Sequence, residues 1–218
     1  MFFQGKENMK TGNMSVTDYT NALSSKAPVP GGGGASALSG ALSASLAQMV
    51  CNLTIGKKKY ADAEEEITRI GQEMKEKQDK FLFLADQDAE VFEPLSRAYS
   101  LPALTEEEKK KKEQIMEDLL AAAANVPLRI MEEAAAVSDG LAVLLEKGST
   151  LAVSDVGCAA GFVRAAISGG MLNVKINTKL MKDREKAAGL DRRAGELFET
   201  GIRKADDICK RVLEKMGS

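Results

Sequence analysis

Apolar residues recur along most of the chain at the three- and four-residue spacing of one helix face, and alternating β-branched runs are missing. The long segments are rich in Ala, Leu, Glu, Lys and Met, which favour helices. Capping residues, prolines and glycines divide the pattern into predicted helices at 15–24, 35–55, 62–99, 105–147, 154–173 and 183–215. The sequence therefore predicts an all-α fold, a bundle of about six helices of which two are long.

Several residues oppose a regular helix. Residues 27–30 contain two prolines, and Gly31 to Gly34 follow directly. Because prolines lack an amide donor and glycines carry a backbone-entropy penalty, we expect residues 27–34 to form a loop. For the same reasons Pro127 predicts a kink in the fourth helix, and Gly169-Gly170 predicts a distortion of the fifth.

The second predicted helix carries small residues on two adjacent faces, so another backbone can approach it closely. We expect this helix to be central and tightly packed. The small residues are Ser36, Gly40 and Ala44 on one face and Ser39, Ser43 and Ala47 beside it.

Composition is typical of one globular domain, with 218 residues, 44% hydrophobic and 28% charged. We place this domain at residues 15–218 and interpret residues 1–14 as a disordered leader. No run of about 20 apolar residues is evident, so no membrane span is expected. With 30 basic against 32 acidic residues the net charge is −2, which predicts no nucleic-acid partner. The run from Lys109 to Lys112 is flanked by acidic residues and is interpreted as a solvated face.

The chain has three widely separated cysteines and no histidine. The cysteine spacing fits neither a disulfide framework nor a metal site, which predicts a reducing cytoplasm and cysteines that serve as small core residues. Without histidine, Ser-His and Cys-His nucleophiles and histidine metal ligands are excluded. Chemistry must use carboxylates, lysines, tyrosines, hydroxyls or backbone amides.

Asp88 interrupts an apolar helix face in the third predicted helix. The face also contains Phe81, Leu84, Val91, Phe92 and Leu95. An unpaired buried carboxylate is costly, so Asp88 should be paired, have a raised pKa or face a ligand cavity. A functional carboxylate and a structural salt bridge both fit this pattern. Asp86, Glu90 and Glu93 project to another side and are expected to be solvated.

The glycine run matches two nucleotide-binding motifs only in part. Gly32-x-Gly34-x-x-Ala37 has the dinucleotide spacing but no preceding strand, and a P-loop needs a Gly-Lys-Ser/Thr ending that Gly34-Ala35-Ser36 lacks. What remains is a glycine-rich entry into a helix, whose free amides can hold a carboxylate or an oxyanion. A flexible turn that permits close packing fits equally well.

Polar residues also mark the fifth predicted helix. Ser154-Asp155 can cap its start, and Asn173 and Asn177 fall one turn apart if the helix continues. Each also has a purely structural interpretation, because asparagines near a helix end often form caps or turns.

Six segments of the chain, taken in order, resemble one known family. They are residues 27–33, Gly56-Lys57-Lys58, residues 86–92, Val126-Pro127-Leu128, Ser154-Asp155 and residues 173–177. The set is similar to the cyclodeaminase domain of formiminotransferase-cyclodeaminase and to its stand-alone bacterial relatives, the methenyltetrahydrofolate cyclohydrolases. The resemblance covers nearly the whole chain from about Asp18 onward.

This resemblance implies an all-helical homodimer that holds a folate substrate near the subunit interface, with Asp88 as the catalytic carboxylate. Lys57 or Lys58 would bind the glutamate tail, and Asn173 and Asn177 would bind the pterin. It implies no metal and no permanently bound cofactor. The substrate-binding positions are Pro30, Gly31, Gly32, Gly33, Lys57, Lys58, Asp155, Asn173 and Asn177. Gly34 stands where relatives often have serine, so no loop hydroxyl is available there.

Two reactions fit the family, and both pass through a tetrahedral carbon between two folate nitrogens. We place the cyclohydrolase first, because no formiminotransferase domain is attached to supply a formimino substrate. The cyclodeaminase, which releases ammonia, is the alternative. A folate-binding protein that has lost catalysis and a nucleotide-binding protein are the remaining hypotheses.

Overall fold

A computed structural model describes residues 10–217, and across this range it contains six α-helices and no strand. The all-α prediction is confirmed. The helices are α1 (Val16–Leu23), α2 (Gly32–Asn52), α3 (Glu64–Ala98), α4 (Glu106–Lys147), α5 (Val153–Thr178) and α6 (Arg184–Gly217). Short 3-10 turns lie at Thr11–Asn13, Lys58–Ala63 and Thr150–Ala152.

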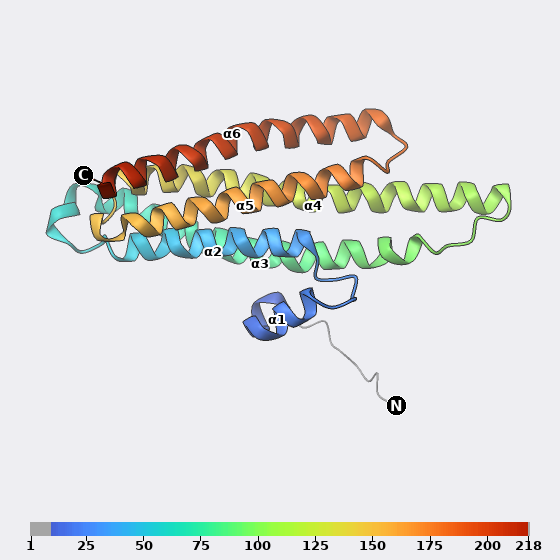
Figure 1. Cartoon of the computed structure of the whole chain (residues 1–218), viewed down its shortest axis with the longest axis horizontal. Helices are drawn as coiled ribbons and strands as arrows, with labels where there is room; N and C mark the ends of the chain where they lie inside the picture. The colour runs from blue at the N-terminus through green and yellow to red at the C-terminus, as the bar shows by residue number, and fades with distance from the viewer. Residues whose placement is uncertain (1–9, 218) are drawn as a thin grey trace.

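Helices α2 to α6 form one elongated bundle, and the short α1 lies against its side (Figure 1). Helix α2 packs against α3 and α5, and α5 also contacts α4 and α6. In the view of Figure 1, α2 and α5 lie in front of α3 and α4. These two helices therefore form one broad side of the bundle.

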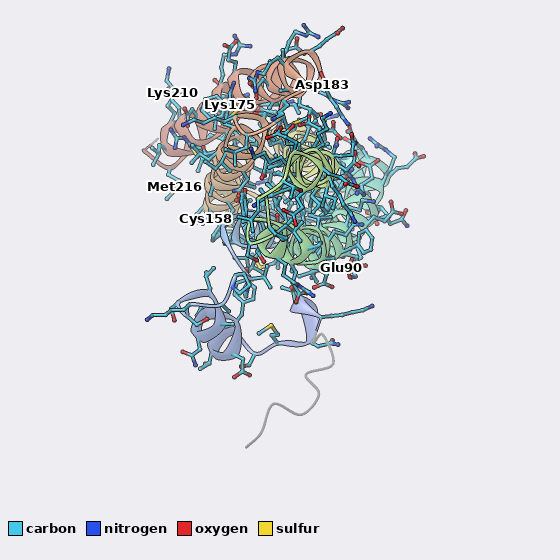
Figure 2. All side chains as sticks on the ribbon, turned by 90° about the vertical axis from the view of Figure 1, so that its right-hand side faces the viewer. Glu90, Cys158, Lys175, Asp183, Lys210 and Met216 are labelled. Carbon is cyan, nitrogen blue, oxygen red and sulfur yellow. The ribbon has the colours of Figure 1, made fainter. Side chains whose placement is uncertain are left out.

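The predicted leader lies mostly outside the described residues. Its described part includes the turn Thr11–Asn13, where the Thr11 N–H donates a 2.7 Å hydrogen bond to Asp86. Asp86 is therefore engaged and partly buried, whereas Glu90 is exposed as expected and projects from the outer side of α3 (Figure 2).

The predicted loop extends too far along the chain, and the two other predicted interruptions do not end a helix. Gly32 to Gly34 are not loop residues but the first turn of α2, where the amides need no helical partner. Helix α4 continues unbroken through Pro127, and α5 continues through Gly169 and Gly170 to Thr178. A Cβ at Gly169 would lie 2.0 Å from the Ser36 hydroxyl oxygen, and one at Gly170 would lie 2.5 Å from the side chain of Met131. These two glycines bring α5 close to α2 and α4 rather than distort it.

The prediction that the second helix is central and closely packed is confirmed. Ala37, Ala44 and Ala47 are fully buried, and the buried Ser43 hydroxyl donates a 2.8 Å hydrogen bond to the Ala159 carbonyl of α5. Because the small side chains of α2 fill little space, larger residues of α3 and α4 occupy the core around them.

The expectation that no segment has the length and composition of a membrane span is not met by the segment that contains α5. By length and composition alone, Thr150–Thr178 is long and apolar enough to cross a membrane. In the fold, α5 packs against three other helices, which accounts for its buried apolar residues but not for the exposed Phe162, Leu172 and Ile176. One cysteine also departs from prediction: Cys51 is buried, but Cys158 of α5 is exposed at the edge of the bundle (Figure 2).

Gly40 marks a close apolar contact between α2 and α3. A Cβ at Gly40 would lie 2.4 Å from the ring of the fully buried Phe81. We predict that Gly40→Ala lowers the free energy of unfolding by about 1–3 kcal/mol, as overpacked cores do. Urea unfolding followed by circular dichroism measures this.

The matched control is Gly195→Ala in α6, where nothing lies within 4 Å of the added Cβ. Alanine has the higher helix propensity, so this change should raise the free energy of unfolding by about 0.5–1 kcal/mol. Equal effects of the two substitutions would show that the α2–α3 contact is not tightly packed.

Candidate active site

Asp88 lies on the face of α3 that points into the bundle. Phe81, Leu84 and Leu95 of the same face are buried, which confirms the predicted helix face. Asp88 itself is partly buried and forms no ion pair with any lysine or arginine among residues 10–217. The structural salt bridge is therefore excluded within this part of the chain, and Asp88 must be stabilised in another way.

The first turn of α2 lies directly against the Asp88 carboxylate. A Cβ at Gly33 would lie only 2.1 Å from one carboxylate oxygen and 2.5 Å from the other. The next residue, Gly34, donates a backbone hydrogen bond to the carboxylate. Only glycine at position 33 lets the helix start approach Asp88 so closely. The anion-binding role predicted for the free amides therefore falls on a carboxylate of the chain itself.

Burial changes the acidity of Asp88. Desolvation raises its pKa from 3.8 to about 6, and the Gly34 hydrogen bond opposes part of that rise. Near neutral pH the carboxylate is mainly ionised yet close to its titration midpoint. A group with this pKa can both accept and return a proton, which suits general acid–base catalysis.

Asp88 opens onto a cavity of about 120 Å³ between α2, α3, α4 and α5. Gly31, Gly32 and Gly33 line it, as predicted, whereas Pro30 does not and instead packs near Gly34. Pro28, Val29, Val91, Phe92, Ala123, Asn173, Ile176 and Asn177 form the remaining walls. The cavity is thus apolar on several sides, with one carboxylate and two amides.

The two asparagines of α5 lie at this cavity, Asn173 inside the helix and Asn177 in its last turn. Asn173 donates from its side-chain nitrogen to the Gly169 carbonyl at 2.8 Å. Asn177 donates to the carbonyls of Asn173 and Ala123, at 2.8 and 3.1 Å. These bonds fix the amide nitrogens on the backbone. The side-chain oxygens remain as acceptors for a ligand.

Lys57, Lys58 and Asp155 are not part of the Asp88 cavity in one chain. The lysines follow the C-terminal end of α2, whereas Gly32 begins that helix at the other end of the bundle. Asp155 lies in the first turn of α5 but makes no capping hydrogen bond, since Ala152 is the N-cap. The predicted cap at Ser154-Asp155 is therefore wrong, and Asp155 contributes only its charge to the helix start.

Tyr19 is a residue of the site that the sequence pattern missed. It is 5% exposed, and its hydroxyl oxygen would lie 3.3 Å from a Cβ at Gly34. Burial and then the nearby Asp88 charge raise the pKa of Tyr19 to about 12. The hydroxyl has no hydrogen-bond partner among the described residues. Its only sequence signal was that it is the sole aromatic residue of the first predicted helix.

Within residues 10–217 there is no group of three cysteine, aspartate or glutamate side chains that could hold a metal ion. The chemistry described here rests on the carboxylate, the amides and the helix start.

Comparison with known proteins agrees with this geometry. Residues 15–196 match the model of the formiminotransferase-cyclodeaminase family. The chain is 35% identical to methenyltetrahydrofolate cyclohydrolase of Methylorubrum extorquens, over 95% of this chain and 98% of that protein. It is 28% identical to formimidoyltransferase-cyclodeaminase of Mus musculus over 78% of this chain, and it spans 31% of the mouse protein.

A solved structure has the same fold. The crystal structure of formiminotetrahydrofolate cyclodeaminase from Thermotoga maritima superposes with a TM-score of 0.78 and 29% identity. The match covers 94% of this chain and 96% of the other.

The raised pKa of Asp88 has a consequence for stability. A carboxyl whose pKa is higher in the folded than in the unfolded state loses stability as pH rises from about 4 to about 6. The shift from 3.8 to about 6 corresponds to about 3 kcal/mol. We predict that Asp88→Asn raises the free energy of unfolding by up to about 3 kcal/mol at pH 8 and by little at pH 4.

Denaturant unfolding of both proteins at several pH values measures this difference. A variant that is less stable than the wild type at pH 8 would contradict the prediction. It would show that the ionised carboxylate is held favourably in the fold.

Proposed function

Because the chain belongs to the formiminotransferase-cyclodeaminase family, we propose that it is a methenyltetrahydrofolate cyclohydrolase. It would hydrolyse 5,10-methenyltetrahydrofolate to 10-formyltetrahydrofolate. The observation that carries this proposal is the carboxylate of Asp88, which faces a cavity without a cationic partner among the described residues and has a pKa of about 6. The full-length similarity to the Methylorubrum extorquens cyclohydrolase favours this reaction.

The first step needs a base and a counter-charge. The methenyl bridge is a cationic amidinium carbon, and the Asp88 carboxylate offsets that charge. As the oxygen of water bonds to the bridge carbon, Asp88 accepts one of its protons. A neutral tetrahedral carbon with a hydroxyl group results, and Asp88 is now protonated.

The second step needs an acid. Asp88 returns its proton to N5 of the folate while the bond between N5 and the bridge carbon breaks. The hydroxyl group loses its proton to solvent and becomes the formyl carbonyl on N10. One water is consumed and one proton is released. A single carboxylate with a pKa of about 6 can serve both steps.

The rest of the cavity would orient the substrate. The side-chain oxygens of Asn173 and Asn177 accept hydrogen bonds from the amino and ring N–H groups of the pterin, since their nitrogens are held by backbone carbonyls. Phe92 and Val91 provide apolar walls for the ring. Gly33 keeps Asp88 against the helix start, so that the carboxylate is already placed before substrate binds.

Cyclodeaminase activity is the second candidate. The Thermotoga maritima structure and the mouse relative favour it, because both are named as cyclodeaminases. In that reaction N10 attacks the carbon of the formimino group on N5, and Asp88 accepts the proton that N10 loses. Asp88 would then return this proton to the amino group on that carbon, which leaves as ammonia as its bond to the carbon breaks. The same carboxylate serves either reaction, so the two must be distinguished by assay.

We also propose that the protein is a homodimer. The outward side of α2 and α5 is apolar, and this is the side that a second copy would cover. Exposed large apolar side chains on these helices and the turns at their ends are Leu42, Met49, Leu53, Leu151, Phe162, Leu172 and Ile176. Monomeric proteins usually expose apolar residues singly, whereas a patch of this extent is typical of an interaction surface.

The direct test of function uses two substrates. We expect purified protein to accelerate the loss of methenyltetrahydrofolate absorbance and to release no ammonia from 5-formiminotetrahydrofolate. Ammonia release would assign the cyclodeaminase instead. Folate binding without turnover of either substrate would contradict both enzymatic proposals.

Asp88→Asn tests the catalytic assignment. The amide has the same shape but cannot transfer protons, so we predict that kcat/KM falls by about 10²–10⁴-fold. For the wild type, kcat/KM should rise with pH through about 6, as the carboxylate ionises. The variant should lack this dependence. Circular dichroism provides the control for folding, and near-wild-type turnover in a folded variant would show that the assignment is wrong.

A further inference from the structure

Helix α1 buries a single side chain, and this side chain ends next to Asp88. Between Val16 and Leu23 only Tyr19 is buried, and the short helix lies beside the bundle (Figure 1). The Tyr19 hydroxyl oxygen would lie 3.3 Å from a Cβ at Gly34, the residue whose amide donates to the Asp88 carboxylate. The side chain that anchors α1 therefore reaches the helix start that holds the carboxylate.

The hydroxyl of Tyr19 is not needed to anchor α1. It has no hydrogen-bond partner among residues 10–217, and the Ser149 hydroxyl is the only other buried side-chain polar group of this range in that state. A buried donor without a partner destabilises the fold, and most buried polar groups have one. Phenylalanine would anchor α1 without such a group. The buried hydroxyl of Tyr19 therefore points to a role other than packing.

The Asp88 carboxylate, in turn, has few hydrogen-bond donors. An ionised carboxylate can accept about four hydrogen bonds. Within residues 10–217 only the Gly34 amide donates to Asp88. Tyr19 is close enough to respond to the negative charge of Asp88, which, together with the larger effect of burial, raises the pKa of Tyr19 to about 12. The phenol therefore keeps its proton near neutral pH and remains a donor.

No charged side chain of the described residues pairs with the Asp88 carboxylate. Helix α2 contains no charged residue from Gly32 to Asn52, and Asp88 is the only titratable residue that lines the cavity. On the other helices around the site, charged residues in the neighbouring turns bind other groups or are exposed to solvent: Asp18 of α1, Asp86 and Glu90 of α3, Arg129 of α4 and Lys175 of α5. Tyr19 is therefore the remaining polar group that can act on this charge.

We propose that Tyr19 is a positioning residue for Asp88: its ring keeps the Gly34 amide against the carboxylate, and its hydroxyl stabilises the negative charge of that carboxylate. An O–H group without a fixed partner can rotate, so its hydrogen turns towards the nearby negative charge. Tyr19 does not line the cavity, and it therefore acts through Asp88 rather than on a ligand. The inference rests on the proposed function for the proton transfer that Asp88 would perform.

Stabilisation of the charge matters because burial favours the protonated form of Asp88. In a weakly polar interior, a dipole that points at a charge acts more strongly than it does in water. The Tyr19 hydroxyl and the Gly34 amide together keep the carboxylate ionised near neutral pH, as the attack of water requires. Without the hydroxyl, Asp88 would meet the substrate more often in the protonated form, which cannot accept a proton.

Tyr19→Phe tests the proposal, because it removes the hydroxyl and keeps the ring. The pKa of Asp88 should then rise, since the ionised form loses a stabilising dipole. We expect the midpoint of the rise of kcat/KM with pH to move up by about 0.5–1 pH unit, which lowers kcat/KM at pH 6 by about two- to fivefold and leaves it nearly unchanged at pH 8. An equal loss of activity at every pH, with an unchanged midpoint, would indicate a purely structural role and would overturn the proposal.

The matched control is Tyr99→Phe. Tyr99 is exposed and follows the end of α3, about 16 Å from Asp88 along the helix axis. Removal of its hydroxyl should leave the midpoint of the pH profile at the wild-type value. A shift as large as that of Tyr19→Phe would show that the effect does not depend on a hydroxyl beside Asp88, and the proposal would then be wrong.

The effect of Tyr19 on Asp88 can also be measured without any activity. Carbon NMR of aspartate-labelled protein, with the Asp88 signal assigned through Asp88→Asn, follows the titration of this carboxyl group directly. We expect its midpoint to lie at higher pH in Tyr19→Phe than in the wild type. Identical titrations would overturn the proposal. A higher midpoint in a protein that turns over neither folate would support the effect of Tyr19 and refute the proposed function.

Gly34→Ser offers a rescue, because it can return a hydroxyl to the same place. In the wild type the added Cβ would lie 3.3 Å from the Tyr19 hydroxyl oxygen, closer than an ordinary contact, so Gly34→Ser alone should lower kcat/KM. In the Tyr19→Phe background this oxygen is absent. We expect the double variant to bring the midpoint back towards the wild-type value and to exceed both single variants in kcat/KM at pH 6. A folded double variant that keeps the midpoint of Tyr19→Phe would count against the proposal.

Discussion

The contact between the Asp88 carboxylate and the first turn of α2 is the constraint on which the rest of the site depends. Gly33 has no Cβ, and the carboxylate occupies the space that one would fill. The approach brings the Gly34 amide to the carboxylate and fixes where α2 starts relative to α3. It also sets the cavity walls, because Gly32 of the same turn lies against Asn173, whose side-chain nitrogen would be 3.3 Å from a Cβ at Gly32.

The same contact opposes stability. A carboxylate surrounded by apolar residues with a single amide donor is poorly compensated for the water it loses. The packing around it compensates through tight contacts between α2 and α3, where Phe81 lies against Gly40. Desolvation thus raises the pKa of Asp88 into the range useful for proton transfer. Close packing of the helices offsets the free-energy cost of burying the carboxylate.

The fold and part of the site followed from sequence because helix periodicity and caps are local signals. Asp88 could be predicted because a carboxylate on an otherwise apolar helix face is costly to bury unless it has a function or a partner. The glycines are harder to predict, since propensity alone treats Gly32 to Gly34 as helix breakers and Gly169-Gly170 as a distortion. Their role depends on what lies opposite, here Asp88, Ser36 and Met131. Tyr19 was missed for the same reason, because nothing near it in sequence indicates a carboxylate.

The family resemblance predicts that Lys57 and Lys58 bind the same substrate as Asp88. Within one chain, however, the length of α2 lies between the two lysines and Asp88. These statements agree if the functional unit is larger than one chain. Helix α5 points the same way: its apolar content exceeds what α2, α4 and α6 cover, and its outward residues include Phe162, Leu172 and Ile176. A helix apolar on its outer side needs a partner. The second copy proposed above would cover that outer side.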